Sequence, residues 1–356
     1  MPRMLVIFSF LFHVSAFAQD DDFSLRRAGM TEYLAGHFTD AEALLRRSLL
    51  AARTKNDSYS AALSYSALGD VYQIQVRLSE AEGAYRNAIS ALGDRPEWSH
   101  ALAITWRNLG SVLTAQGRYR EALSALKRGA KLISEQNITD PELRAQLLHS
   151  QGTTYFYKGD MKRAVIALRE AIAISWSPTN RFVIDTADML SNLGRAYEAT
   201  HQYSKAEDAF KRSLHLAEQR WGPSHPNVTP VLNNLGSFYM GISRFNDAED
   251  QFLRSVAILQ GSSDPSLQNS IMMAFYGLGT TYFRQNQIAR AEEPLAKAAE
   301  MARSATKPPN EAPEILETYA NVLRGLWNPA EAQRVRAEAH RIRVALALTV
   351  RIDGVK

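Results

Sequence analysis

The chain has 356 residues, of which 46% are hydrophobic and 22% are charged, so it contains enough apolar material for a sizeable core. Its net charge is only +4, and the basic and acidic residues are mixed along the chain, which argues against a nucleic-acid-binding protein. The absence of cysteine excludes disulfides, thiolate metal sites and a cysteine nucleophile.

The N-terminus has the layout of an export signal. In MPRMLVIFSFLFHVSAFAQDDD, one cation precedes an apolar run that ends in Ala-Phe-Ala before a polar stretch. We predict a signal peptide over residues 1–18; an uncleaved anchor and a buried cytosolic helix are the alternatives. The apolar run of about 15 residues is shorter than the roughly 20 that a spanning helix needs. No later segment could span a bilayer, so we expect no integral membrane segment after cleavage, and a location in the periplasm or envelope of a bacterium, or secretion.

The rest of the chain repeats one phrase, for example SALGDVY, SNLGRAY and NNLGSFY. A small residue marks each of eight units, 40 to 43 residues apart: Gly29, Gly69, Gly110, Gly152, Gly194, Gly236, Gly279 and Ala320. An alanine follows each marker after twelve residues: Ala41, Ala81, Ala122, Ala164, Ala206, Ala248, Ala291 and Ala332. A large apolar residue follows most of these alanines four residues later, from Leu45 to Leu295.

These spacings predict eight helical hairpins. Large apolar residues recur at intervals of three and four, which is one face of a helix, and a short polar break separates two such helices in each unit. We interpret the glycine and alanine markers as the places where two helices cross closely. We expect seven hairpins over residues 19–304, a Pro-rich break at 305–313, and a terminal hairpin with a capping helix over 314–356.

The phrase W-x2-L-G-x2-L at Trp106–Leu113, followed by Ala122 and Leu126, resembles the tetratricopeptide repeat. The period near 42 resembles the subclass found in kinesin light chains. The resemblance implies an all-α fold, a right-handed α-solenoid of about eight tetratricopeptide-like hairpins. In the first unit, Glu32 stands where the pattern expects tyrosine.

The sequence contains few motifs that could support catalysis or metal binding. The eight histidines form neither an H-E-x-x-H pair nor a zinc-finger set, and there is no phosphate loop or nucleophile elbow. We therefore predict no catalytic residues, no metal and no cofactor. The basic segment Arg334–Arg351 is interpreted as a capping helix, and contact with anionic lipid or an acidic partner is the alternative.

The position two residues before the marker glycine is asparagine in three central units: Asn108, Asn192 and Asn234. The resemblance implies that these asparagines line a concave groove and bond the backbone of a bound peptide; the alternative is that they bond the backbone of neighbouring helices and stabilise the stack. Other candidate groove residues could meet carboxylates or apolar side chains: Arg107, Arg195, His149, Phe156, Tyr157, Tyr276 and Phe283.

We therefore expect a non-catalytic interaction scaffold that binds an extended protein or peptide segment in its groove. Two rival interpretations stay open. The chain could be an accessory subunit of an envelope enzyme or assembly complex, using its convex face or its C-terminal helix, or it could be an enzyme itself. The partner and the oligomeric state are not predicted.

Overall fold

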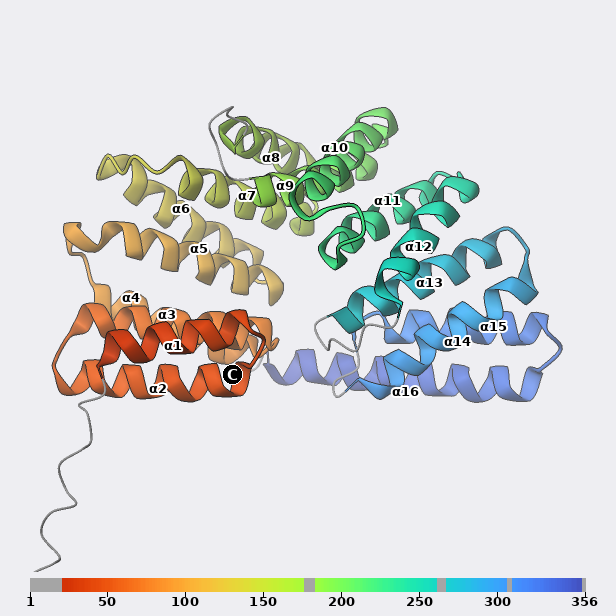
Figure 1. The fold of residues 1–356 in the computed structure, drawn as a ribbon, viewed down its shortest axis with the longest axis horizontal. Coiled ribbons are helices and arrows are strands. Elements are labelled where there is room, and N and C mark those ends of the chain that lie inside the picture. The colour runs from red at the N-terminus through yellow and green to blue at the C-terminus, as the bar shows by residue number, and fades with distance from the viewer. Residues whose placement is uncertain (1–20, 176–182, 261–266, 306–308, 354–356) are drawn as a thin grey trace, which may run out of the picture. The chain divides into compact units, whose positions relative to one another are not determined.

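The computed structural model describes residues 21–175, 183–260, 267–305 and 309–353, and these residues form sixteen α-helices, two short 3₁₀ helices and no strand (Figure 1). The all-α class predicted from the sequence is confirmed. The predicted signal peptide at residues 1–18 lies outside the described residues, as do residues 306–308 of the Pro-rich break.

The α-helices follow one another as eight hairpins, each with an odd-numbered first helix and an even-numbered second helix. In chain order they are α1 (Asp22–Leu34) and α2 (Phe38–Thr54), α3 (Ser58–Ile74) and α4 (Leu78–Leu92), α5 (Ser99–Ala115) and α6 (Tyr119–Glu135), α7 (Pro141–Lys158) and α8 (Met161–Ser175), α9 (Val183–Ala199) and α10 (Tyr203–Trp221), α11 (Thr229–Gly241) and α12 (Phe245–Leu259), α13 (Gln268–Arg284) and α14 (Ile288–Ser304), and α15 (Ala312–Gly325) and α16 (Pro329–Asp353). The 3₁₀ helices Pro96–Trp98 and Pro226–Val228 precede α5 and α11.

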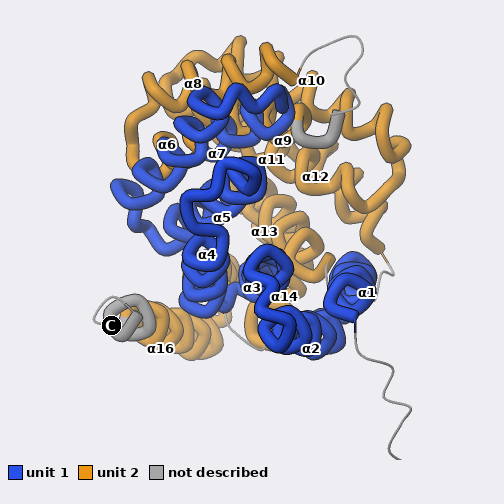
Figure 2. Tube along the Cα trace, turned by 90° about the vertical axis from the view of Figure 1, so that its left-hand side faces the viewer, with its two compact units in different colours: residues 1–150 blue, residues 151–356 orange. Residues whose placement is uncertain are grey.

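The chain divides into two compact units, residues 1–150 and 151–356 (Figure 2). Unit 1 contains α1 to α6 and the start of α7; unit 2 contains the end of α7 and α8 to α16. Within each unit, a second helix packs both on the first helix of its own hairpin and on the first helix of the next. One hairpin cannot cover its own apolar face, so stacking is what buries the core.

The marker residues sit at the crossing of the two helices in each hairpin, as predicted. The marker alanines from Ala41 to Ala291 are completely buried, and Ala332 is nearly so. A side chain on any of the seven marker glycines would collide with the large residue four positions after the alanine. At Gly110, for example, an added Cβ would lie 2.6 Å from Cγ of Leu126. Close approach of the two backbones therefore requires glycine here.

The turn between the two helices uses one left-handed residue in every hairpin, always seven positions after the marker. These residues are Gly36, Val76, Gly117, Gly159, His201, Ser243, Asn286 and Trp327, with φ between 58° and 86°. Only glycine adopts this conformation without steric cost. Val76 and Trp327 are therefore strained positions, which hydrophobic periodicity does not predict.

Candidate functional site

The ten residues predicted to line the groove all lie on first helices, but they belong to different units. Unit 1 holds Arg107 and Asn108 on α5 and His149 on α7. Unit 2 holds the other seven, on α7, α9, α11 and α13: Phe156, Tyr157, Asn192, Arg195, Asn234, Tyr276 and Phe283. Each group is a surface of its own unit.

The three asparagines share one bonding pattern. The side-chain amide nitrogen of each donates a hydrogen bond to a polar side chain on the preceding first helix: Asn108 to Asp70 at 3.1 Å, Asn192 to Thr153 at 3.4 Å and Asn234 to Ser191 at 2.9 Å. The bonds join adjacent first helices through side chains rather than through the backbone. The donor half of each amide thus supports the stack, while the carbonyl oxygen of Asn234 has no hydrogen-bond partner among the described residues.

Asp70 is the centre of a polar cluster in unit 1. Its carboxylate accepts hydrogen bonds from the Tyr85 hydroxyl at 2.6 Å and from Asn108 at 3.1 Å. Arg107 in turn donates to the carbonyl oxygen of Asn108 at 2.8 and 3.1 Å. Burial raises the pKa of Asp70. These groups satisfy one another, so we interpret this cluster as support for the helix stack.

Arg195 on α9 brings together two of the predicted aromatic residues in unit 2. Its guanidinium carbon lies 4.8 Å from the ring centroid of Phe156 and 5.8 Å from that of Tyr157. The two rings meet edge to face with centroids 5.5 Å apart. These distances allow cation–π attraction. Because Tyr157 is 50% exposed, the cluster is accessible from solvent.

Glu198, which sequence analysis did not select, lies one helical turn after Arg195. Burial raises the pKa of its carboxyl group, and the positive charge of Arg195 opposes this effect. The carboxylate has no hydrogen-bond partner among the described residues, and a partly buried acceptor of this kind is stabilised by an incoming N–H donor. We call Phe156, Tyr157, Arg195, Glu198 and Asn234 the first-helix strip.

The strip is continuous across α7, α9 and α11. Asn234 bonds Ser191, which lies one turn before Arg195 on the same face of α9, and Arg195 reaches the two rings on α7. The remaining predicted residues are placed differently. Tyr276 packs against the apolar core of the last two hairpins, and burial raises its pKa to about 12. Phe283 and His149 are half-buried.

Another recurring group was not predicted from the sequence. In it, a tyrosine on a first helix donates a hydrogen bond to a glutamate of the preceding second helix, and an arginine forms an ion pair with the same glutamate. The tyrosine–glutamate and glutamate–arginine distances are 3.3 and 2.6 Å for Tyr72, Glu42 and Arg77, 3.0 and 3.0 Å for Tyr239, Glu207 and Arg244, and 3.0 and 2.6 Å for Tyr282, Glu249 and Arg290. We call this group the junction clamp. Its sequence signal is the glutamate directly after the marker alanine.

The comparison with protein families agrees with this geometry. The tetratricopeptide repeat family model matches residues 101–175 and 185–261. These two segments carry tetratricopeptide repeats. No curated protein matches the chain.

Three solved structures, two of them described as containing tetratricopeptide repeats, resemble the chain in fold. A tetratricopeptide repeat protein from Parabacteroides merdae is 16% identical with a TM-score of 0.55, covering 85% of this chain and 98% of its own. A signal transduction ATPase with a tetratricopeptide repeat sensor, from Pyrococcus horikoshii, is 12% identical with a TM-score of 0.63, covering 94% of this chain and 49% of its own. BtubC (BKLC) from P. vanneervenii is 16% identical with a TM-score of 0.54, covering 65% of this chain and 92% of its own. At these identities the likeness concerns the fold alone.

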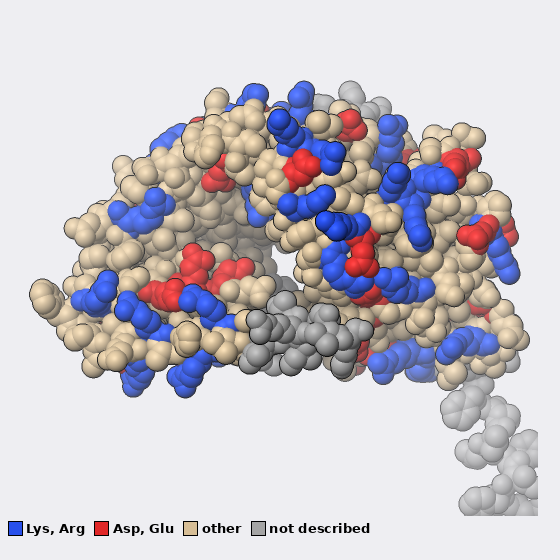
Figure 3. Space-filling view, turned by 180° about the vertical axis from the view of Figure 1, so that it is seen from behind, with Lys and Arg blue, Asp and Glu red and all other residues tan. Residues whose placement is uncertain are grey.

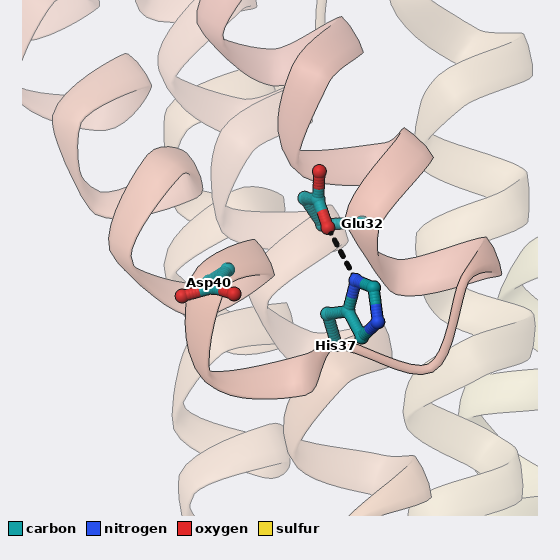
Figure 4. Close-up of side chains that lie close together, drawn as sticks. All are labelled: Glu32, His37 and Asp40. Atoms are coloured by element: carbon teal, nitrogen blue, oxygen red, sulfur yellow. Dashed lines mark hydrogen bonds and ion pairs between the residues drawn. The ribbon is translucent and has the colours of Figure 1, made fainter.

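One group of side chains among the described residues could hold a metal ion. Glu32, His37 and Asp40, around the turn of the first hairpin, each offer a ligand atom within 4.8 Å of the others (Figure 4). Nδ1 of His37 lies 2.7 Å from Oε2 of Glu32. A solvent-accessible contact between an imidazole and a carboxylate accounts for this arrangement, so we assign no metal to it.

The charged surface and the last helix show no concentrated basic patch on the face that is drawn (Figure 3). On the face drawn in Figure 3, Lys and Arg side chains are scattered widely, with smaller groups of Asp and Glu among them. Part of the basic helix α16 is engaged by its neighbours, because Arg343 pairs with Glu317 at 2.8 Å and Arg303 with Glu338 at 2.8 Å. No described helix combines the length and apolar character needed to cross a membrane.

Proposed function

We propose that the chain is an exported, non-catalytic interaction module whose first-helix strip binds an extended segment of a partner protein. The observation that carries the proposal is the open cluster of Arg195 over Phe156 and Tyr157, next to the unbonded carboxylate of Glu198. Tyrosine and arginine are the side chains that most often dominate the energy of protein interfaces.

The strip offers complementary groups to a peptide backbone. Glu198 and the carbonyl oxygen of Asn234 can each accept a hydrogen bond from a backbone N–H. The exposed ring of Tyr157 can pack against an apolar side chain, and Arg195 can donate to a carbonyl or carboxylate oxygen. An extended segment presents all of these groups at short intervals, which is why we favour it over a folded surface.

The structure changes the choice of test variant. Replacing the three asparagines would break bonds between helices and confuse folding with binding. We therefore choose a double substitution, Tyr157→Ser with Arg195→Gln, in the full-length chain. Ile166→Ser on α8 is the matched control, because Ile166 is also exposed, at 58%. Circular dichroism should show equal helicity for all three chains.

The readout is affinity capture from an envelope extract. We expect the double variant to lose a partner that the unchanged chain and the Ile166→Ser chain both retain. If the double variant retains every partner, the first-helix strip is not the binding surface. The rival interpretation, an accessory subunit that binds through its other helices or through α16, would then be favoured.

Export is a separate part of the proposal and has its own measurement. We propose cleavage after Ala18, on the basis of the apolar run and the Ala-Phe-Ala ending. Mass spectrometry of the chain isolated from the envelope fraction should find an N-terminus at Gln19. A chain that retains Met1 and stays in the cytoplasm would contradict export.

A further inference from the structure

The junction clamp shows what a carboxylate does between two consecutive second helices. At the junction of α12 and α14, Glu249 accepts a hydrogen bond from the Tyr282 hydroxyl at 3.0 Å and pairs with Arg290 at 2.6 Å. At the junction of α10 and α12, Glu207 occupies the same register and also pairs with Lys211, four residues later on its own helix, at 2.7 Å. Each carboxylate therefore joins a tyrosine hydroxyl to one or more cations.

The junction of α8 and α10 has the tyrosine and the cation of the Glu249 clamp but no carboxylate, and Gln202 stands at the position of Arg77 and Arg244. Val165 directly follows the marker Ala164 and so takes the register of Glu207 and Glu249. Counting from their markers, the other three positions correspond one to one: Tyr197 to Tyr282, Lys205 to Arg290 and Arg169 to Lys211.

No carboxylate in the described part of the chain bonds Tyr197, Lys205 or Arg169. Lys205 donates to Gln202 at 2.8 Å and lies 5.6 Å from the centre of the Tyr197 ring. Among the described residues, the Tyr197 hydroxyl has no hydrogen-bond partner and Arg169 has no ion pair.

A cavity opens at the same place. It has a volume of about 660 Å³ and lies between α8, α9 and α10 of unit 2. Its apolar lining includes Ile172, Leu190 and Leu193, and three of its lining residues are cations: Arg169, Lys205 and Arg212. The one acidic residue in the lining, Asp208, is 3.6 Å from Arg212 on its own helix. The lining thus combines an apolar floor with an excess of positive charge.

We propose that this cavity is a binding site for a carboxylate side chain of a partner protein, flanked by apolar residues. The incoming carboxylate would take the place that Glu249 holds at its own junction, accepting from the Tyr197 hydroxyl and pairing with Lys205 and Arg169. The neighbouring apolar side chains of the partner would pack at the edge of the cavity, whose apolar lining residues Ile172, Leu190 and Leu193 are already largely buried. The site lies between α8, α9 and α10 and shares no residue with the first-helix strip.

The most direct test introduces the missing carboxylate into the chain itself by a substitution. Val165→Glu in the full-length chain should rebuild the clamp, raise the thermal unfolding midpoint and occupy the site. The probes are two peptides, acetyl-Ala-Leu-Glu-Leu-Ala-amide and its Gln counterpart, followed through the methyl resonances of Ile172, Leu190 and Leu193. We expect the Glu peptide to bind about tenfold more tightly than the Gln peptide, because a charge-assisted bond is lost in the latter. Val165→Glu should abolish this preference.

A loss variant keeps the proposal testable if Val165→Glu does not fold. Lys205→Met should reduce the preference for the Glu peptide at least about threefold, whereas Lys211→Met, whose cation is already paired with Glu207, should leave it unchanged. Equal binding of the two peptides, no binding of either, or an unchanged preference in both Val165→Glu and Lys205→Met would each overturn the proposal.

Discussion

The ring of Tyr85 lies against the backbone of Gly69 so closely that a methyl group on Gly69 would stand 2.6 Å from Cε1 of the ring. The same tyrosine is completely buried, and its hydroxyl donates to Asp70, the residue after the glycine. The crossing of α3 and α4 therefore couples a steric constraint to a hydrogen bond. Adding one methyl group at Gly69 tests this constraint.

Gly69→Ala should lower the free energy of unfolding by about 1–3 kcal/mol, because Tyr85 has to move from a packed position. Gly83→Ala is the matched control on α4, where an added Cβ would meet nothing within 4 Å. There, alanine should raise stability by about 0.5–1 kcal/mol through its better helix propensity. Denaturant unfolding of both variants measures whether each substitution lowers or raises the free energy of unfolding. A stabilising effect at both sites would show that the crossing is looser than the structure indicates.

This part of the fold could be predicted from sequence because one physical constraint recurs eight times. The spacing of Gly69 and Gly110, and of Ala81 and Ala122, reports the crossing directly, since only small residues fit there. The partner of each glycine, four positions after the alanine, follows from helical periodicity. Turn strain could not be predicted in the same way, because Val76 occupies a position where the other units use mostly polar residues or glycine.

Val76→Gly should stabilise unit 1 by about 1 kcal/mol. Val76 has a φ of 59°, and the left-handed conformation costs a β-branched residue about 1–2 kcal/mol. Its side chain is 59% exposed, so little burial is lost. Gly117→Val, at the same position of the next turn, should destabilise by a similar amount, since φ there is 76°. Thermal unfolding midpoints that move in the same direction in the two variants would contradict this account.

Glu249→Gln should destabilise the stack of α12 and α14 by about 1 kcal/mol, because it weakens the hydrogen bond from Tyr282 and removes the charge facing Arg290. The control is Glu293→Gln, whose side chain is 78% exposed and pairs only with Lys297 on the same helix. We expect no measurable change there, as is usual for exposed pairs. The denaturant midpoints of the two variants compare a junction clamp with an ordinary surface ion pair. Equal midpoints would show that the junction clamp does not stabilise the stack.

The candidate site was less accessible to sequence analysis than the fold. The asparagine row was visible, but the partners of Asn192 and Asn234 lie about forty residues earlier, on another helix, and nothing in the spacing identifies them. Glu198 was missed because its significance comes from burial beside Arg195. The junction clamp was predictable in principle, since the glutamate after the marker alanine recurs. The glutamate is replaced by Val165 in one unit. That replacement suggests a binding site only because Tyr197 and Lys205 line a cavity.

The partly buried carboxyl group of Asp70 should make the stability of unit 1 depend on pH with a definite sign. Burial raises the pKa of Asp70 in the folded chain, although Tyr85 and Arg107 act in the opposite direction. The folded state therefore binds a proton more readily than the unfolded state, so this contribution to stability is complete below the unfolded pKa of 3.8 and is lost as pH rises through the folded pKa.

Asp70→Asn removes that titration while keeping an acceptor for Tyr85 and Asn108. The stability of the unchanged chain relative to Asp70→Asn should therefore increase from neutral pH to about pH 4. Asp57→Asn is the opposite case, because hydrogen bonds from Ser60 lower the pKa of Asp57. The unchanged chain should lose stability relative to Asp57→Asn as pH falls through the unfolded pKa of 3.8 toward the lower folded pKa. Denaturant unfolding at several pH values measures both differences, and parallel slopes would show that Asp70 is better solvated than its contacts indicate.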